Sequence, residues 1–146
     1  MNFSSCIAKQ KEIEDLFRDK TGEQERYEAI IALGKKLPKL PVELKTDENL
    51  VKGCQSRTYI CSTFDGITMH IKGESDALIS SGLLHLLLKA YDGEAPETIL
   101  KCPPAFIEAL NLAASLSPNR ANGLYSMHLR LKQDALKFLI EAGIVE

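Results

Sequence analysis

Cys54 lies in a short stretch of small and polar residues, Gly53 to Ser56, with apolar β-forming residues on either side. This pattern predicts a turn between two extended segments, so the thiol is expected at the tip of a loop. The thiolate is the reactive form of cysteine, and the neighbouring cations Lys52 and Arg57 favour a lowered pKa for this thiol. Cys54 is therefore the first candidate nucleophile. The alternative is a small buried side chain, because free cysteines often pack as hydrophobes.

The other three cysteines are scattered, and no two of the four form a C-x-x-C pair. Such spacing argues against a zinc ribbon, a dithiol redox motif and a disulfide scaffold. Cys61 alternates with Ile60 in a predicted strand, which favours packing over reactivity. Cys102 precedes two prolines and a predicted helix, whose N-terminus can lower a thiol pKa, so it is the second candidate nucleophile. Cys6 has no assigned role.

Composition limits the function further. The chain has 146 residues, 45% hydrophobic and 26% charged, which is typical of one globular domain covering residues 1–146. A formal charge of −2 gives no basic footprint for nucleic acid. No apolar run approaches a membrane span, and the first residues lack the pattern of a signal peptide. We expect a cytoplasmic protein with reduced thiols, no nucleic-acid or membrane partner, and no metal site, since its three histidines are dispersed.

Periodicity predicts the secondary structure. A first helix is expected to begin at Ser4 or Ser5 and to end before Thr21. Its apolar positions are Ile7, Ile13, Leu16 and Phe17. Further helices are expected over about 23–35, 76–91, 105–116 and 124–141, with a turn at 95–100 and a loop at 117–123. The helix over 76–91 is the most apolar and should lie at the centre of the core.

Between the second and third helices the period changes to alternation. Strands are predicted over 49–52, 58–64 and 67–72, with Asp65-Gly66 forming a type I′ turn between the last two. Three such strands would make a small antiparallel sheet that helices cover largely on one face. The predicted fold class is therefore α+β, with the Cys54 loop and the loop of Arg120 at one end. His85, in the central helix, is expected to be a packing residue.

Four blocks of the sequence carry a resemblance to a known family: Leu33–Pro38, Val51–Arg57, Gly73–Ala77 and Leu116–Leu124. In this order along the chain they resemble the SufE family of sulfur acceptors. Val51–Arg57 is similar to that family's Gly-Cys-Gln-Ser signature. The resemblance implies the fold shared by SufE proteins and the U-type iron–sulfur scaffolds, in keeping with the predicted α+β class.

The resemblance also implies a function. Cys54 would accept sulfur as a persulfide from a cysteine desulfurase of the SufS or CsdA type, stimulate that enzyme, and pass the sulfur to a SufBCD-like iron–sulfur scaffold. Gly53, Gln55, Ser56 and Arg57 would support the loop or the partner contact. Arg120 would steady sulfur anions or the partner, and Asp76 would hold the loop closed. Pyridoxal phosphate would reside on the desulfurase, so the chain needs no cofactor of its own and is a carrier and activator rather than a stand-alone enzyme.

Three functions remain open from the sequence. Besides relay, the chain could be an adaptor that docks on a desulfurase or scaffold without carrying sulfur, or a thiol redox protein. A cluster scaffold is disfavoured because clusters are held by several cysteines and no ligand set accompanies Cys54. For a relay we expect the Cys54 side chain to be tucked inward against the central helix at rest, since persulfides are easily reduced or oxidised. The chain is expected to be a monomer or a homodimer.

Overall fold

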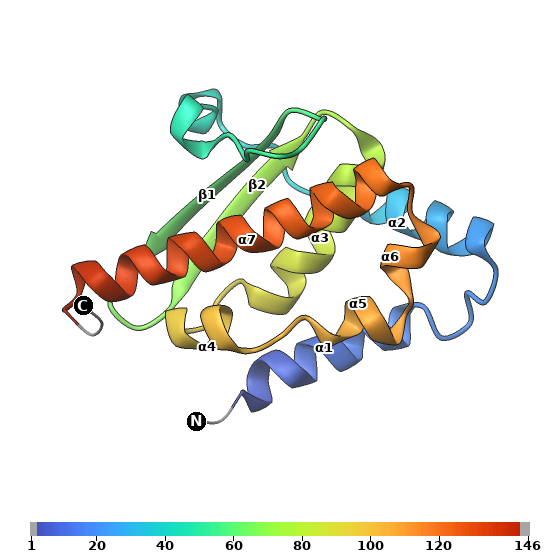
Figure 1. Ribbon diagram of the computed structural model, residues 1–146, viewed down its shortest axis with the longest axis horizontal. Helices are drawn as coiled ribbons and strands as arrows, with labels where there is room; N and C mark the ends of the chain where they lie inside the picture. The colour runs from blue at the N-terminus through green and yellow to red at the C-terminus, as the bar shows by residue number, and fades with distance from the viewer. Residues whose placement is uncertain (1–2, 144–146) are drawn as a thin grey trace.

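An antiparallel hairpin and a long final helix cross the molecule beside one another, with an apolar helix packed beneath both (Figure 1). The computed structural model of the chain describes residues 3–143. Its helices are α1 (Ser4–Leu16), α2 (Glu23–Lys36), α3 (Leu78–Tyr91), α4 (Pro96–Lys101), α5 (Ala105–Ala109), α6 (Leu112–Ser115) and α7 (Pro118–Glu141). Its strands are β1 (Thr58–Phe64) and β2 (Met69–Ser75), and two 3₁₀ turns cover Val42–Leu44 and Asp47–Asn49. The α+β class predicted from the sequence is confirmed.

The sheet has two strands in the described residues, where the sequence predicts three. β1 and β2 pair in the register Ile60↔Gly73. The segment expected to be a third strand instead forms a 3₁₀ turn and then makes a single bridge, Leu50↔Tyr59. Leu50 is followed within three residues by Gly53, where the chain turns away, so there is no length for a ladder. One sheet face is buried against helices, because β2 alternates between buried and exposed residues.

The hairpin turn also differs from the prediction. The loop contains four residues rather than two, because Phe64 pairs with Met69. The Asp65 carboxylate accepts hydrogen bonds from the backbone N–H groups of Ile67 and Thr68, both at 2.8 Å. An aspartate that bonds its own backbone in this way stabilises a longer turn. The strand prediction over 67–72 was therefore early at both ends.

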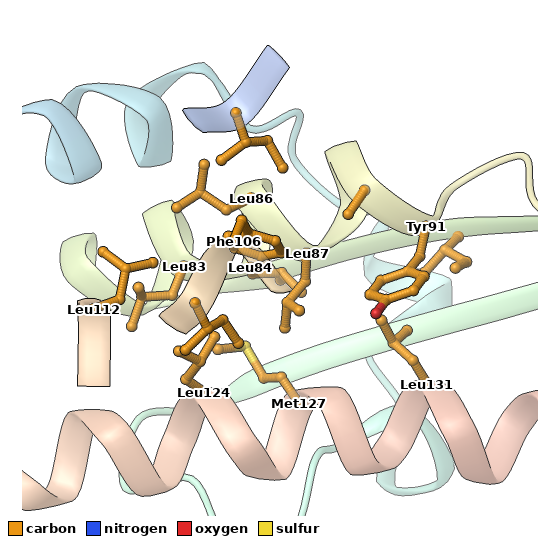
Figure 2. Packing of buried hydrophobic residues seen from close by; sticks show 14 of the residues in the cluster. Leu83, Leu84, Leu86, Leu87, Tyr91, Phe106, Leu112, Leu124, Met127 and Leu131 are labelled. Atoms are coloured by element: carbon orange, nitrogen blue, oxygen red, sulfur yellow. The ribbon is translucent and has the colours of Figure 1, made fainter. Parts of the chain in front are cut away.

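α3 is the central core helix, as its sequence predicts. Its leucines Leu83, Leu84, Leu86 and Leu87 are almost completely buried, and Tyr91 lies at one end of the cluster (Figure 2). α3 contacts α1, α2, β2 and α7. The approach of α2 is close at Gly34, because a Cβ there would lie 2.7 Å from the Gly82 backbone nitrogen. Core packing thus fixes the ends of α3, β1 and α7 relative to one another.

The apolar face of α1 differs from the prediction at two of its four positions. Ile7 and Leu16 are 47% and 45% exposed, whereas Cys6, Gln10, Ile13 and Phe17 are buried. The difference comes from Gln10, whose amide donates to the Pro103 carbonyl at 3.0 Å and accepts from the Phe106 N–H at 3.1 Å. A buried polar side chain with satisfied hydrogen bonds is tolerated in a core.

Three predictions in the second half of the chain were wrong. The expected turn at 95–100 is the helix α4, which begins with Pro96 in its first turn. The helix expected over 105–116 is broken into α5 and α6, since Asn111 adopts a left-handed conformation with φ of 53°. The expected loop at 117–123 is the beginning of α7.

No helix within residues 3–143 is both long and apolar enough to cross a membrane.

Acid should destabilise the protein through His128. Its ring stacks on Tyr91, its Nε2 atom is buried without a hydrogen-bond partner among the described residues, and burial lowers its pKa from 6.5 to about 4. Between pH 6.5 and 4 the unfolded chain therefore binds a proton at His128 that the folded chain does not bind. The free energy of unfolding should fall as the pH drops from 6.5 toward 4. Urea unfolding of wild type and His128→Phe across this range would measure the effect. If the free energy of unfolding of His128→Phe fell with decreasing pH as steeply as that of wild type, His128 would not be the cause.

Candidate functional site

The Cys54 loop is fixed at both ends by backbone contacts. At its start the Val51 N–H donates to the Thr58 carbonyl at 2.8 Å. At its end the Arg57 N–H donates to the Asp76 carboxylate at 2.9 Å, and the Asp76 N–H donates back to the Arg57 carbonyl at 3.1 Å. Asp76 thus clamps the loop to the segment that leads into α3. The loop-closing role expected for Asp76 stays a prediction.

Gly53 turns the chain immediately before the cysteine. Its φ is +92°, a left-handed value that favours glycine. A side chain at this position would also collide with the Ser126 hydroxyl on α7. The loop therefore lies directly on α7, and glycine is required both for the turn and for this contact.

The Cys54 thiol is half-buried against α7. Its Sγ donates to the Gly123 carbonyl oxygen at 3.6 Å, and the side chain packs on the edge of the apolar cluster. Burial raises the pKa of the thiol, and a hydrogen bond with the Thr58 side chain opposes this only partly. The lowered pKa predicted from the neighbouring cations is wrong, because Lys52 and Arg57 are exposed and neither acts on the sulfur.

A pocket of about 430 Å³ opens beside the thiol. It is built by three segments: the Cys54 loop, the start of α3 and the first turns of α7. Its lining residues are Cys54, Gln55, Ser56, Ala77, Ile79, Ser80, Ser117, Asn119, Arg120 and Gly123. The pocket brings three consecutive signature residues, Cys54, Gln55 and Ser56, next to Arg120, which is distant from them in the sequence.

A network of hydroxyl groups supports the loop from below. Ser56 Oγ lies 3.0 Å from both Thr58 Oγ1 and Ser80 Oγ, and Thr58 Oγ1 lies 2.9 Å from Ser75 Oγ. Thr58 is completely buried. These bonds connect the loop to the end of β2 and to α3, so Ser56 serves to hold the loop. Gln55 is exposed at the pocket rim and Arg57 points its side chain to solvent.

Arg120 lies in the first turn of α7 rather than in a loop. Ser117 caps this helix by accepting the Arg120 N–H at 3.4 Å, and Pro118 occupies the first turn. The Arg120 guanidinium lies over the Tyr27 ring of α2, 5.1 Å from its centroid. Arg120, which lines the pocket, is therefore carried by a helix and not by a loop.

The other cysteines lie apart from this pocket. Cys6 and Cys102 are buried around the Gln10 amide, which lies 3.5 Å and 3.8 Å from their sulfurs. Burial raises the pKa of Cys6 to about 12. All four cysteines are free thiols, and no cluster of three potential metal ligands occurs within residues 3–143. Cys102, the second candidate nucleophile, is 3% exposed, so the geometry makes it a core residue.

Several site residues were missed from the sequence. Gly123 and Ser126 contact the loop from α7. Gly123 belongs to this helix because α7 begins at Pro118, and the Ser117-Pro118 pair is a helix-start signal that predicts this. Once the helix begins there, Arg120 and Gly123 are three residues apart and share a face. Tyr27 gave no sequence signal, since its spacing is that of a packing residue.

Residues 11–135 match the family model SufE, described as an Fe-S metabolism associated domain. The chain belongs to the SufE family. It is similar to an uncharacterized SufE-like protein of Synechocystis, with 36% identity over 86% of this chain and 79% of the relative. It is also 36% identical to the sulfur acceptor protein CsdE of Escherichia coli, over 79% of this chain and 80% of CsdE.

The similarity extends to a plant protein and to a solved structure. SufE-like protein 1 of Arabidopsis, a chloroplastic and mitochondrial protein, is 36% identical over 88% of this chain, which spans 35% of the plant protein. The solution structure of a hypothetical protein from Thermus thermophilus matches 90% of this chain and 96% of that chain, with a TM-score of 0.73 and 25% identity. The fold of this SufE chain therefore has a counterpart among solved structures.

Replacing Gly53 should cost more than replacing a glycine in open space. We expect Gly53→Ala to lower the free energy of unfolding by about 1–2 kcal/mol from backbone strain, with a further loss from the contact with Ser126. Gly66→Ala is the matched control, because Gly66 has a similar φ of +99° and nothing within 4 Å of its Cβ position. Urea unfolding of both variants would measure the difference. Equal losses would show that the Ser126 contact is unimportant.

Burial should make the resting Cys54 thiol a slow nucleophile. Because its pKa is raised, Cys54 should reach half its maximal rate of alkylation by iodoacetamide at a pH above about 8.5, which is the pKa of a free cysteine. Peptide mass spectrometry after timed alkylation at several pH values reads Cys54 separately from the other cysteines. The same experiment in urea should return the midpoint to the free value, and a folded midpoint below 8.5 would contradict the burial argument.

Proposed function

We propose that this SufE protein accepts sulfur from a cysteine desulfurase, carries it as a persulfide on Cys54 and passes it on for iron–sulfur cluster assembly. The observation that supports this most directly is a half-buried thiol beside an open pocket whose rim carries Arg120. A buried structural cysteine would have no such access. The E. coli relative is named a sulfur acceptor, which agrees with this role.

The chemical step is an exchange at sulfur. The Cys54 thiolate attacks the outer sulfur of the desulfurase persulfide, a new S–S bond forms at Cys54, and the bond to the donor cysteine breaks. The donor cysteine leaves as a thiolate, so atoms and charge balance without an external oxidant. The thiol proton of Cys54 must first be lost to solvent or to a partner group. Since burial raises the pKa of this thiol, docking is expected to expose the sulfur and start the reaction.

The residues around Cys54 divide the remaining work. Arg120 offers a permanent positive charge to the sulfur anions that enter and leave the pocket. Asp76 and Ser56 hold the two sides of the loop, through the Arg57 N–H and the Ser80 hydroxyl. Gly53 permits the turn, and Gln55, exposed at the rim, contacts the docked partner. In this account the loop is closed at rest and is opened by the partner.

The partners follow from the proposed reaction. The desulfurase, of the SufS or CsdA type, holds the pyridoxal phosphate that splits cysteine, and this chain supplies only the accepting sulfur. A SufBCD-like scaffold receives the sulfur afterwards. We place the protein in the cytoplasm, a reducing compartment in which four free cysteines are stable. Docking on the desulfurase also stimulates its turnover, because the persulfide is removed from it.

The adaptor function is separated from relay by one comparison. Desulfurase turnover, measured as alanine released from cysteine, should rise with wild-type protein and stay at the basal rate with Cys54→Ser. Cys61→Ser is the matched control, because Cys61 is also half-buried but lies in β1 away from the pocket. It should stimulate like wild type. Binding of Cys54→Ser to the desulfurase should persist, and full stimulation by this variant would favour the adaptor.

A further inference from the structure

Arg120 is held at the pocket rim by one aromatic ring. Its guanidinium lies 5.1 Å from the centroid of Tyr27, and no carboxylate within residues 3–143 forms an ion pair with it. The Ser117 cap binds the Arg120 backbone N–H and so does not fix the position of the guanidinium. Tyr27 belongs to α2, so the contact connects two elements distant in the sequence. The ring is itself fixed, because Tyr27 packs against the apolar cluster.

We propose that Tyr27 is the positioning residue for Arg120, and that its aromatic face keeps the guanidinium at the rim of the Cys54 pocket, ready for the sulfur anion of an incoming persulfide. The inference rests on the function proposed above. An exposed arginine has many rotamers, and restricting them beforehand lowers the entropy lost when the anion binds. A planar guanidinium over a ring face remains charged and keeps its edge N–H groups available for hydrogen bonds.

Arg120 does not lower the pKa of the resting Cys54 thiol. Burial is the main influence on the pKa of Cys54, and Arg120 is not among the groups that alter it. The charge is therefore available to the donor's sulfur and not consumed by Cys54. Tyr27 contributes to transfer by acting through Arg120, and it does not touch the sulfur.

The alternative is that Tyr27 only fills space between α2 and α7. Two substitutions separate these roles. Tyr27→Phe keeps the ring face and loses only the hydroxyl, whereas Tyr27→Leu keeps an apolar side chain and loses the ring. A cation–π contact at an exposed site corresponds to about a two- to five-fold effect in an equilibrium or rate. We therefore expect sulfur transfer to Cys54 to fall two- to five-fold in Tyr27→Leu and to be unchanged in Tyr27→Phe.

The test is a double-mutant cycle on the rate of persulfide formation at Cys54, with the loaded desulfurase as donor and single-turnover kinetics at several donor concentrations. In the Arg120→Ala background, Tyr27→Leu should cause no further loss, because the side chain it positions is gone. An equal fold-loss in both backgrounds would overturn the proposal and assign Tyr27 to packing. The proposal would also be overturned if Tyr27→Phe slowed sulfur transfer as much as Tyr27→Leu does, because the missing hydroxyl would then explain the effect.

A second measurement does not depend on sulfur transfer. The Nε–H resonance of Arg120, assigned by comparison with Arg120→Ala, should be shifted by the Tyr27 ring current in wild type and Tyr27→Phe, and should return to the ordinary arginine position in Tyr27→Leu. No ring-current shift in wild type would overturn the contact itself. If the shift is present but wild type accepts no sulfur from any desulfurase, the proposed function fails, and the positioning role in transfer fails with it. If wild type accepts sulfur and the cycle is additive, the positioning role alone fails.

Discussion

The contact between the Cys54 loop and the first turns of α7 is the constraint on which the site depends. The sulfur donates to the Gly123 carbonyl, and Gly53 lies on Ser126. A Cβ atom at Gly123 would lie 3.8 Å from the sulfur, so the thiol packs directly on the helix at a position without a side chain. α7 is held in turn by its buried residues Leu124, Met127 and Leu131, which lie on the side of the helix that faces α3 (Figure 2). Core packing thus determines how deeply the thiol lies.

If Cys54 carries sulfur as proposed, its half-burial reconciles two opposing demands on such a carrier. A persulfide in water is lost to reductants and oxidants, so the carrier should shield it. Transfer nevertheless requires the sulfur to reach a partner's sulfur. The backbone hydrogen bonds of the loop lie near its ends, at Val51 and at Arg57, whereas the Cys54 sulfur is held through its bond to the Gly123 carbonyl. The proposed opening would break the sulfur contact and leave the base of the loop fixed. Burial raises the pKa of the thiol at rest, and a partner that displaces the tip removes that cause.

Local sequence signals predicted α3 and β1 well, because their periodicity is strong and agrees with their burial. They failed where a tertiary contact overrides the pattern. Gln10 is buried because distant backbone groups satisfy its amide, and no spacing rule reveals that. Cys54 was identified from its residue pattern and from the family resemblance. The inward placement predicted for its thiol is met in part, because the side chain is half-buried, but its sulfur bonds to Gly123 of α7 and not to the central helix α3. Counting neighbouring charges gave the wrong sign for the pKa of this thiol, since burial is the main influence on it and comes from tertiary packing that local sequence does not reveal. One such contact is with Gly123, 69 positions away.

The most direct test of the account is to locate the transferred sulfur. After incubation with a cysteine desulfurase and cysteine, followed by trapping with an alkylating reagent, peptide mass spectrometry should find an added mass of about 32 units on Cys54 of the wild-type protein. The adduct should be absent from Cys54→Ser and present in Cys61→Ser. Sulfur found on Cys61 or Cys102, or an unmodified protein that still binds the enzyme, would contradict the assignment of Cys54 as the carrier.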